Sequence, residues 1–204
     1  MPQAHLIVRM ARVYTYAVSM LRFFEWLAST PWSVALHESL WAYPLIESTH
    51  VLTLGLFVGT AIMLDLRLLG WSFKRVPASE FVHRVLPWTR AAFYVMVTTG
   101  VLLFYAIPVR NYQNIFFRVK MLMFVLALLN IWYFHNWTEP GIAAWDTSER
   151  PPRAARVAGI ASIVLWLSIV VAGRMIAYNW FDCDIQPQPA FVNWAAGCVV
   201  PPSQ

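Results

Sequence analysis

Residues 44–70 read PLIESTHVLTLGLFVGTAIMLDLRLLG, a long apolar run with ionisable side chains only near its two ends. About 20 apolar residues in a helix cross a hydrocarbon layer of about 30 Å, so this run is long enough to span a membrane. Three further apolar runs follow at residues 88–108, 115–135 and 155–178. The sequence therefore predicts an all-α integral membrane protein built as a four-helix bundle.

The composition of the whole chain supports a location in the lipid bilayer. Hydrophobic residues make up 59% and charged residues 12% of the 204 residues. A typical soluble domain has about twice that charged fraction. Tryptophan and tyrosine gather near the ends of the apolar runs, as is typical of the lipid–water boundary. The net charge of +5 indicates contact with lipid headgroups rather than nucleic acid, because no basic block stands outside the runs.

The residues before the first run predict a further helix. Residues 12–29 carry one polar stripe at helical spacing, which is typical of an amphipathic helix lying in the membrane interface. A fifth spanning helix is the alternative. We therefore divide the chain into an N-terminal helical segment at 1–43, a membrane domain at 44–178 and an extracytoplasmic tail at 179–204.

The distribution of positive charge predicts the direction of the spans. Lys and Arg are more frequent in the 71–90 and 136–156 connections than on the other side, and none follows Tyr178. The positive-inside rule places these connections in the cytoplasm and the tail outside. Cys183 and Cys198, the only cysteines, both lie in the tail. An oxidising compartment there predicts one disulfide, and two free thiols are the alternative.

Ionisable side chains at the edges of the apolar runs are the candidate functional residues, because a charge in hydrocarbon is costly. Glu47 and His50 are three residues apart and share one face of a helix. We expect His50 to ligate a haem iron or another metal, with Glu47 orienting its imidazole. A buried histidine that only joins helices is the alternative. Di-iron bundles use the same Glu-x-x-His spacing, but this chain has no second copy of it.

Three more histidines lie near the ends of the runs. His37 precedes the first run and is either a second ligand beside His50 or a headgroup contact. His83 and His135 lie on the cytoplasmic side, where they predict a second site for a haem or a quinone head group; exposed loop histidines are the alternative. His50 and His135 are separated by roughly 20 Å along the membrane normal at helical rise, so they cannot share one iron. Met175 is another candidate partner for His50.

Other polar residues in the runs have simpler expected roles. Asp65 and Arg67 close the first run and are expected to pair with each other or with the basic loop residues and so to anchor the helix end. Arg174 is expected to reach the interface, to pair with Glu47 or to hold a haem propionate. Asn130 is interpreted as a hydrogen bond between helices.

Several stretches in combination carry a family resemblance. They are ESLW at 38–41, PLIESTH at 44–50, LDLRLLG at 64–70, LPWT at 86–89, FRVKM at 117–121 and GRMIAY at 173–178. Over roughly residues 24–178 the chain resembles an uncharacterised family of small bacterial inner-membrane proteins, a domain of unknown function with four core spans. In layout it is distantly similar to copper-resistance D-type membrane proteins. The resemblance implies the bacterial inner (cytoplasmic) membrane, hence a periplasmic tail, and it draws attention to Glu47, His50, Asp65, Arg67, Lys120, His135 and Arg174.

The first functional hypothesis is a membrane redox subunit that binds b-type haem and passes electrons between the quinone pool and a partner protein. The candidate cofactor-binding residues are His50, His135, His37, His83, Arg174 and Glu47, of which His50 and His135 are the first candidates as metal ligands. A non-catalytic accessory or assembly subunit of a larger membrane complex is the alternative. Copper handling, suggested by the layout and by eight methionines, comes third. The chain has no phosphate loop, Cys-x-x-Cys pair or nucleophile elbow, so no catalytic residue is assigned and no stand-alone enzyme is expected.

Overall fold

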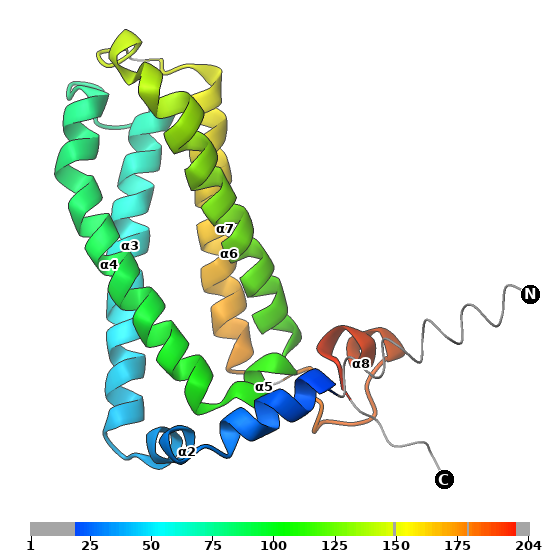
Figure 1. The fold of residues 1–204 in the computed structure, drawn as a ribbon. Coiled ribbons are helices and arrows are strands. Elements are labelled where there is room, and N and C mark those ends of the chain that lie inside the picture. Colours follow the sequence, from blue (N-terminus) through cyan, green and yellow to red (C-terminus); the bar gives the residue numbers. More distant parts are fainter. Residues whose placement is uncertain (1–18, 149, 179, 199–204) are drawn as a thin grey trace, which may run out of the picture.

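The structure is a computed structural model that describes residues 19–148, 150–178 and 180–198. The described residues form helices, turns and loops but no strand, which confirms the predicted all-α class. Four helical segments are long and apolar enough to cross a membrane. Their main helices are α3 (Ala42–Leu69), α4 (Ala78–Ala106), α6 (Ile115–Tyr133) and α7 (Arg153–Ile176), and they form the bundle seen in Figure 1.

The second span begins earlier than the apolar run predicted. α4 starts at Ala78 rather than at residue 88, and Pro87 lies inside the helix. Proline removes one backbone hydrogen bond but does not end this helix. The first turns of α4 contain several polar residues, so they did not form part of the apolar run from which the span was predicted. His83 consequently lies in a helix and not in a loop.

The third span continues beyond the expected end of its run. A π-helical turn, η1 (Phe134–Thr138), follows α6 directly, and a 3₁₀ helix, η2 (Glu139–Ala144), follows η1. π-helical turns are rare and are often found at functional sites. His135 lies in this turn.

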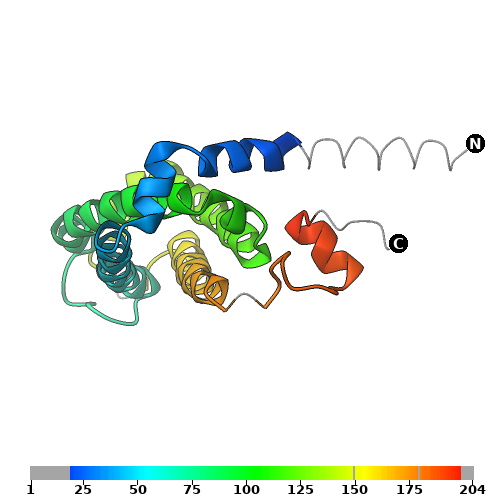
Figure 2. The same ribbon diagram turned by 90° about the horizontal axis from the view of Figure 1, so that it is seen from below.

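The four spans pack as two pairs that meet along one seam. α3 packs mainly on α4 and α6 mainly on α7, while contacts between α3 and α7 join the pairs. Figure 2 shows the same arrangement from below. The buried core at their centre consists of Phe57, Ala92, Met96, Ala127, Trp166 and Ile169. Large rings and small side chains share this core, so the helices approach closely there.

The bundle has two different ends. The end that carries the connections at 70–77 and 145–152 is called the loop end below. The opposite end, called the tail end, carries three short helices: α2 (Pro31–Glu38), α5 (Pro108–Tyr112) and α8 (Ala190–Ala196).

The described part of the N-terminal segment lies across the tail end. Residues 19–28 are helical, and together with α2 they run across the ends of the spans rather than along them (Figure 1). The Thr30 hydroxyl lies 2.7 Å from the Tyr105 hydroxyl, and the Ser33 hydroxyl donates to the Tyr105 carbonyl at 2.8 Å. These bonds fix α2 against α4. Of the two expected arrangements, the described residues fit an interfacial helix; residues 12–18 of the predicted helix lie outside the description.

The tail folds back onto the same end. A disulfide links Cys183 to Cys198. Arg118 on α6 donates from Nη1 to the Ala195 carbonyl at 2.8 Å and from Nε to the Tyr112 carbonyl at 3.0 Å. Its guanidinium also lies 4.7 Å from the centre of the Tyr112 ring. One arginine therefore ties α8 and α5 to the base of α6.

At the loop end, Asp146 caps a helix that has no cap of its own. α4 follows Pro77, whose side chain cannot accept a hydrogen bond. The Asp146 carboxylate accepts hydrogen bonds from the Ser79 amide at 2.7 Å and from the Ser79 hydroxyl at 2.9 Å. Its backbone carbonyl accepts from the Ala78 amide at 2.9 Å. The bond from the Ser79 amide is the main reason why the pKa of Asp146 lies below its ordinary value, and the Ser79 hydroxyl and the Arg67 charge act in the same direction.

The cap gives a pH-dependent prediction. We expect Asp146→Asn to lower the free energy of unfolding by no more than about 1 kcal/mol, because the carboxylate is partly exposed and screened. A carboxyl whose pKa is lower in the folded state binds fewer protons there, so its stabilisation is present above about pH 4 and is lost as the pH falls further. Thermal unfolding in detergent between pH 3 and pH 7 tests this. A difference between native and variant protein that persists unchanged at the acid end would contradict it.

Candidate functional site

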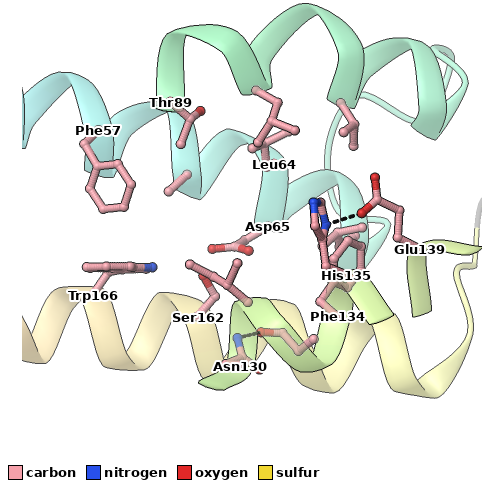
Figure 3. Close-up of a pocket in the computed structure, with 16 residues that line it drawn as sticks. Phe57, Leu64, Asp65, Thr89, Asn130, Phe134, His135, Glu139, Ser162 and Trp166 are labelled. Carbon is pink, nitrogen blue, oxygen red and sulfur yellow. Dashed lines mark hydrogen bonds and ion pairs between the residues drawn. The ribbon is translucent and has the colours of Figure 1, made fainter. Parts of the chain in front are cut away.

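A cavity of about 140 Å³ lies between the four spans in the half of the bundle nearer the loop end (Figure 3). Most of its lining is apolar, from side chains such as Phe57, Leu64 and Trp166. A few polar side chains share the lining: Asp65, Thr89, Asn130, His135, Glu139 and Ser162. An apolar chamber with few polar groups is the usual form of a small-molecule site.

Asp65 is the most unusual residue in this cavity. Its side chain projects from α3 towards Ser162 and Trp166 on α7 (Figure 3), and the residue is only 6% exposed. The Ser162 hydroxyl interacts with the carboxyl. The other oxygen, Oδ2, is buried and has no hydrogen-bond partner among the described residues. A buried polar atom without a partner costs about 1–3 kcal/mol, so its position needs a functional explanation.

The expectation that Asp65 pairs with Arg67 is wrong. Arg67 is buried and donates from Nε to the Val76 carbonyl at 3.0 Å and from Nη2 to the Asp146 carbonyl at 2.9 Å. Residues two positions apart on a helix face in different directions. Asp65 therefore faces the interior, and Arg67 joins the two connections of the loop end.

His135 and Glu139 stand at the end of the cavity opposite Phe57 and Trp166 (Figure 3). His135 Nδ1 forms an ion pair with the Glu139 carboxylate. Nη2 of Arg90 lies 3.4 Å from His135 Nε2. Both ring nitrogens of His135 thus have neighbours, which leaves this histidine poorly placed as a metal ligand. The sequence analysis missed Glu139, although its spacing of four residues from His135 was a readable signal.

The two histidines of the loop end do not form the expected pair. His83 makes no hydrogen bond and no ring contact with His135 within the described part of the chain. α4 begins ten residues earlier than expected, so His83 lies on the exposed surface of this helix and not in a loop.

His50 lies in the other half of the bundle and is anchored to α4. Its Nδ1 is 3.0 Å from the Met96 carbonyl and 3.0 Å from the Thr99 hydroxyl. A Cβ atom at Gly100 would come within 3.2 Å of the imidazole, so glycine lets the ring lie against the α4 backbone. Nε2 of His50 has no hydrogen-bond partner among the described residues. The Met96 carbonyl, and not Glu47, orients this ring.

Lys120 on α6 is the charged residue that acts electrostatically on His50. Its charge acts on the imidazole, and its side chain lies beside Gly173 of α7, where a Cβ would be 3.7 Å from Nζ. Lys120 is half-buried and forms no ion pair within the described residues. A membrane-embedded ammonium in this position attracts an anionic group. The sequence analysis had noted Lys120 only through the family resemblance.

The remaining candidate residues have other neighbours. The His37 ring contacts the Tyr43 ring with centroids 6.2 Å apart and makes no ring contact with His50. Glu47 is exposed and makes no ion pair among the described residues. The Arg174 guanidinium lies 5.1 Å from the centre of the Tyr178 ring, so the expected pairing with Glu47 is wrong. No group of three or more His, Cys, Asp or Glu side chains in the described ranges is arranged so that it could hold a metal ion.

Comparison with known proteins identifies the family. Residues 23–179 match the family of unknown function DUF6644. The chain belongs to this family. The match covers the four spans and leaves out the N-terminal residues and the disulfide-linked tail, which confirms the resemblance to an uncharacterised membrane family. The match does not show a relationship to copper-resistance D proteins. No curated protein and no solved structure matches the chain.

Proposed function

We propose that this protein is a membrane redox subunit that binds a b-type haem through His50 and passes electrons between the quinone pool and a partner protein. The observation that supports the proposal is the state of the His50 ring. A carbonyl oxygen only accepts hydrogen bonds, so a proton on Nδ1 would satisfy the contact with the Met96 carbonyl. Nε2 then carries a lone pair, and an imidazole fixed through its other nitrogen is the usual arrangement of a metal ligand.

The surroundings of His50 suit a cofactor that carries carboxylates. The Lys120 ammonium lacks an ion-pair partner among the described residues and acts on the same imidazole. A haem propionate would supply that partner, a role that the sequence analysis had given to Arg174. Bound haem would supply a one-electron carrier, while the chain would supply the ligand and the counter-charge.

The proposal is narrower than the hypothesis drawn from sequence. Both nitrogens of His135 already have neighbours, and His37 is packed against Tyr43. We therefore propose one haem in the tail-end half and no second haem at the loop end.

A difference absorption spectrum, dithionite-reduced minus oxidised, tests the proposal on detergent-purified protein from haem-sufficient cells. We expect the α band of a b-type haem in the native protein. His50→Ala should reduce the haem content by at least about tenfold, because it removes the proposed ligand. His83→Ala is the matched control and should keep the band. A folded native protein with a flat spectrum would overturn the proposal.

The proposal includes a location and an orientation. We place the protein in the bacterial inner membrane with the tail end in the periplasm. The excess of Lys and Arg in the connections of the loop end supports this orientation. The Cys183–Cys198 disulfide at the other end fits an oxidising compartment. Cysteine substitutions in either end, labelled with a membrane-impermeant maleimide in intact cells, test the orientation.

A second candidate function is that of an accessory subunit in a larger membrane complex. The exposed surface of α3 favours it. Glu47 lies exposed near the start of this span with no ion pair in the described residues, and Gly55 and Gly59 have nothing within 4 Å of an added Cβ. A glycine face with a free carboxylate suits a helix of a partner protein. If His50→Ala leaves cofactor content and complex assembly unchanged, this function replaces the first.

A further inference from the structure

We propose that the cavity beside Asp65 binds the head group of a membrane quinol, with the Asp65 carboxyl accepting a hydrogen bond from a ring hydroxyl. The inference rests on the proposed redox function for its biological role, since it gives the quinone pool a place on this protein. The binding itself does not require haem. The cavity and His50 lie in different halves of the bundle, so the two sites are tested separately.

The first step of the argument is the unsatisfied oxygen. Asp65 is more than nine-tenths buried, faces the cavity, and has an Oδ2 atom without a donor among the described residues. Ser162 interacts with the same carboxyl but does not satisfy this oxygen. A hydroxyl group of a ligand in the cavity would supply the missing donor.

The second step is the chemistry of the walls. A cavity of about 140 Å³ is several times larger than the space that one water molecule needs, about 10–15 Å³ on the same scale. Apolar cavities stay dry, whereas polar ones fill with water. Most of the wall here is apolar, including the rings of Phe57, Phe134 and Trp166. A flat apolar ring therefore fits the cavity better than a chain of water molecules.

The third step is the placement of polar groups along the cavity. Asp65 lies between the end formed by Phe57 and Trp166 and the far end, where His135 and Glu139 form their ion pair (Figure 3). A quinol carries hydroxyls at opposite edges of a flat ring. One hydroxyl would reach Asp65, and the other would face the ion pair. The remaining edge of the ring would contact apolar side chains only.

The fourth step is the route of entry. The cavity lies inside the membrane domain, between helices that cross the hydrocarbon layer. Its ligand is therefore expected from the lipid phase. The side chains at the far end are partly accessible, with His135 46% and Glu139 30% exposed. A membrane-soluble quinol meets these conditions.

The test is isothermal titration of the detergent-purified full-length protein with a short-chain ubiquinol under anaerobic conditions. We expect saturable binding to the native protein. Asp65→Ala should weaken it by about tenfold or more, because the ring hydroxyl loses its buried hydrogen-bond partner. Glu80→Gln, a change in an exposed carboxylate that pairs with Arg84, is the matched control and should bind as the native protein does.

A second variant covers the chance that Asp65→Ala fails to fold. Ala61→Leu fills the cavity without changing Asp65, because Ala61 lines the wall one helical turn away. It should abolish binding while leaving thermal stability intact. Native protein that does not bind the quinol, or variants that bind it as well as the native protein, would overturn the inference. Haem spectra of the same samples separate the outcomes: a flat spectrum with intact binding rejects the haem proposal alone, and an intact α band without binding rejects the quinol site alone.

Discussion

Trp166→Ala is expected to lower the free energy of unfolding by about 3 kcal/mol, close to the lower end found for deletion of a buried aromatic ring. Trp166 is 2% exposed and lies at the centre of the core. Its ring meets Phe57 edge to face with centroids 4.5 Å apart and Phe124 at 6.1 Å. Removing the Trp166 ring would delete these ring contacts, which help to join the two helix pairs.

The physical reason for this magnitude is packing and not transfer out of water. Lipid chains are as apolar as the core, so the hydrophobic contribution within the membrane is small. What is lost is dispersion contact and edge-to-face ring geometry, together with the empty volume left beside an existing cavity.

Reversible unfolding in mixed detergent micelles, followed by circular dichroism, measures the effect. Trp88→Ala is the control, because Trp88 is 66% exposed on the outside of α4 and should change stability by less than about 1 kcal/mol. Equal losses for the two variants would show that Trp166 does not join the helix pairs as described.

Arg67→Ala is expected to destabilise the loop end by about 3 kcal/mol or slightly more. The side chain is 1% exposed and donates to the carbonyls of Val76 and Asp146, which lie in different connections. Each hydrogen bond from a charged donor contributes about 1.5–3 kcal/mol, and both carbonyls would lose their donor. Since Asp146 caps α4, the loss should extend to the first turn of that helix.

Limited proteolysis and thermal unfolding together measure this effect, because a released connection becomes a cleavage site. Arg67→Lys should also destabilise, since a single ammonium does not reproduce the forked geometry of a guanidinium. Arg84→Ala is the control: Arg84 is 73% exposed and pairs with Glu80 on the surface, so its loss should change stability by no more than about 0.5 kcal/mol. If Arg67→Ala behaved like this control, Arg67 would not hold the connections.

The candidate site was predicted from sequence only in part. The principle that ionisable groups in hydrocarbon mark function singled out His50, Asp65 and His135, and two of these line the cavity. Their partners were missed, because Ser162 and the Met96 carbonyl belong to other helices and carry no motif. The prediction that Glu47 orients the His50 ring was wrong for a related reason. Two residues can share one face of a helix and still turn towards different neighbours.

The sequence by itself determined that the protein lies in a lipid bilayer, that it has four spans and that it is helical, because long apolar runs have one stable form in lipid. It did not determine where α4 begins, since a helix held by tertiary contacts extends through residues that are individually polar. Only the tertiary structure decided that Asp65 faces a cavity while Arg67, two residues later, joins two connections. Helix rotation and the pairing of helices fix these directions, and both depend on packing between segments far apart in the chain.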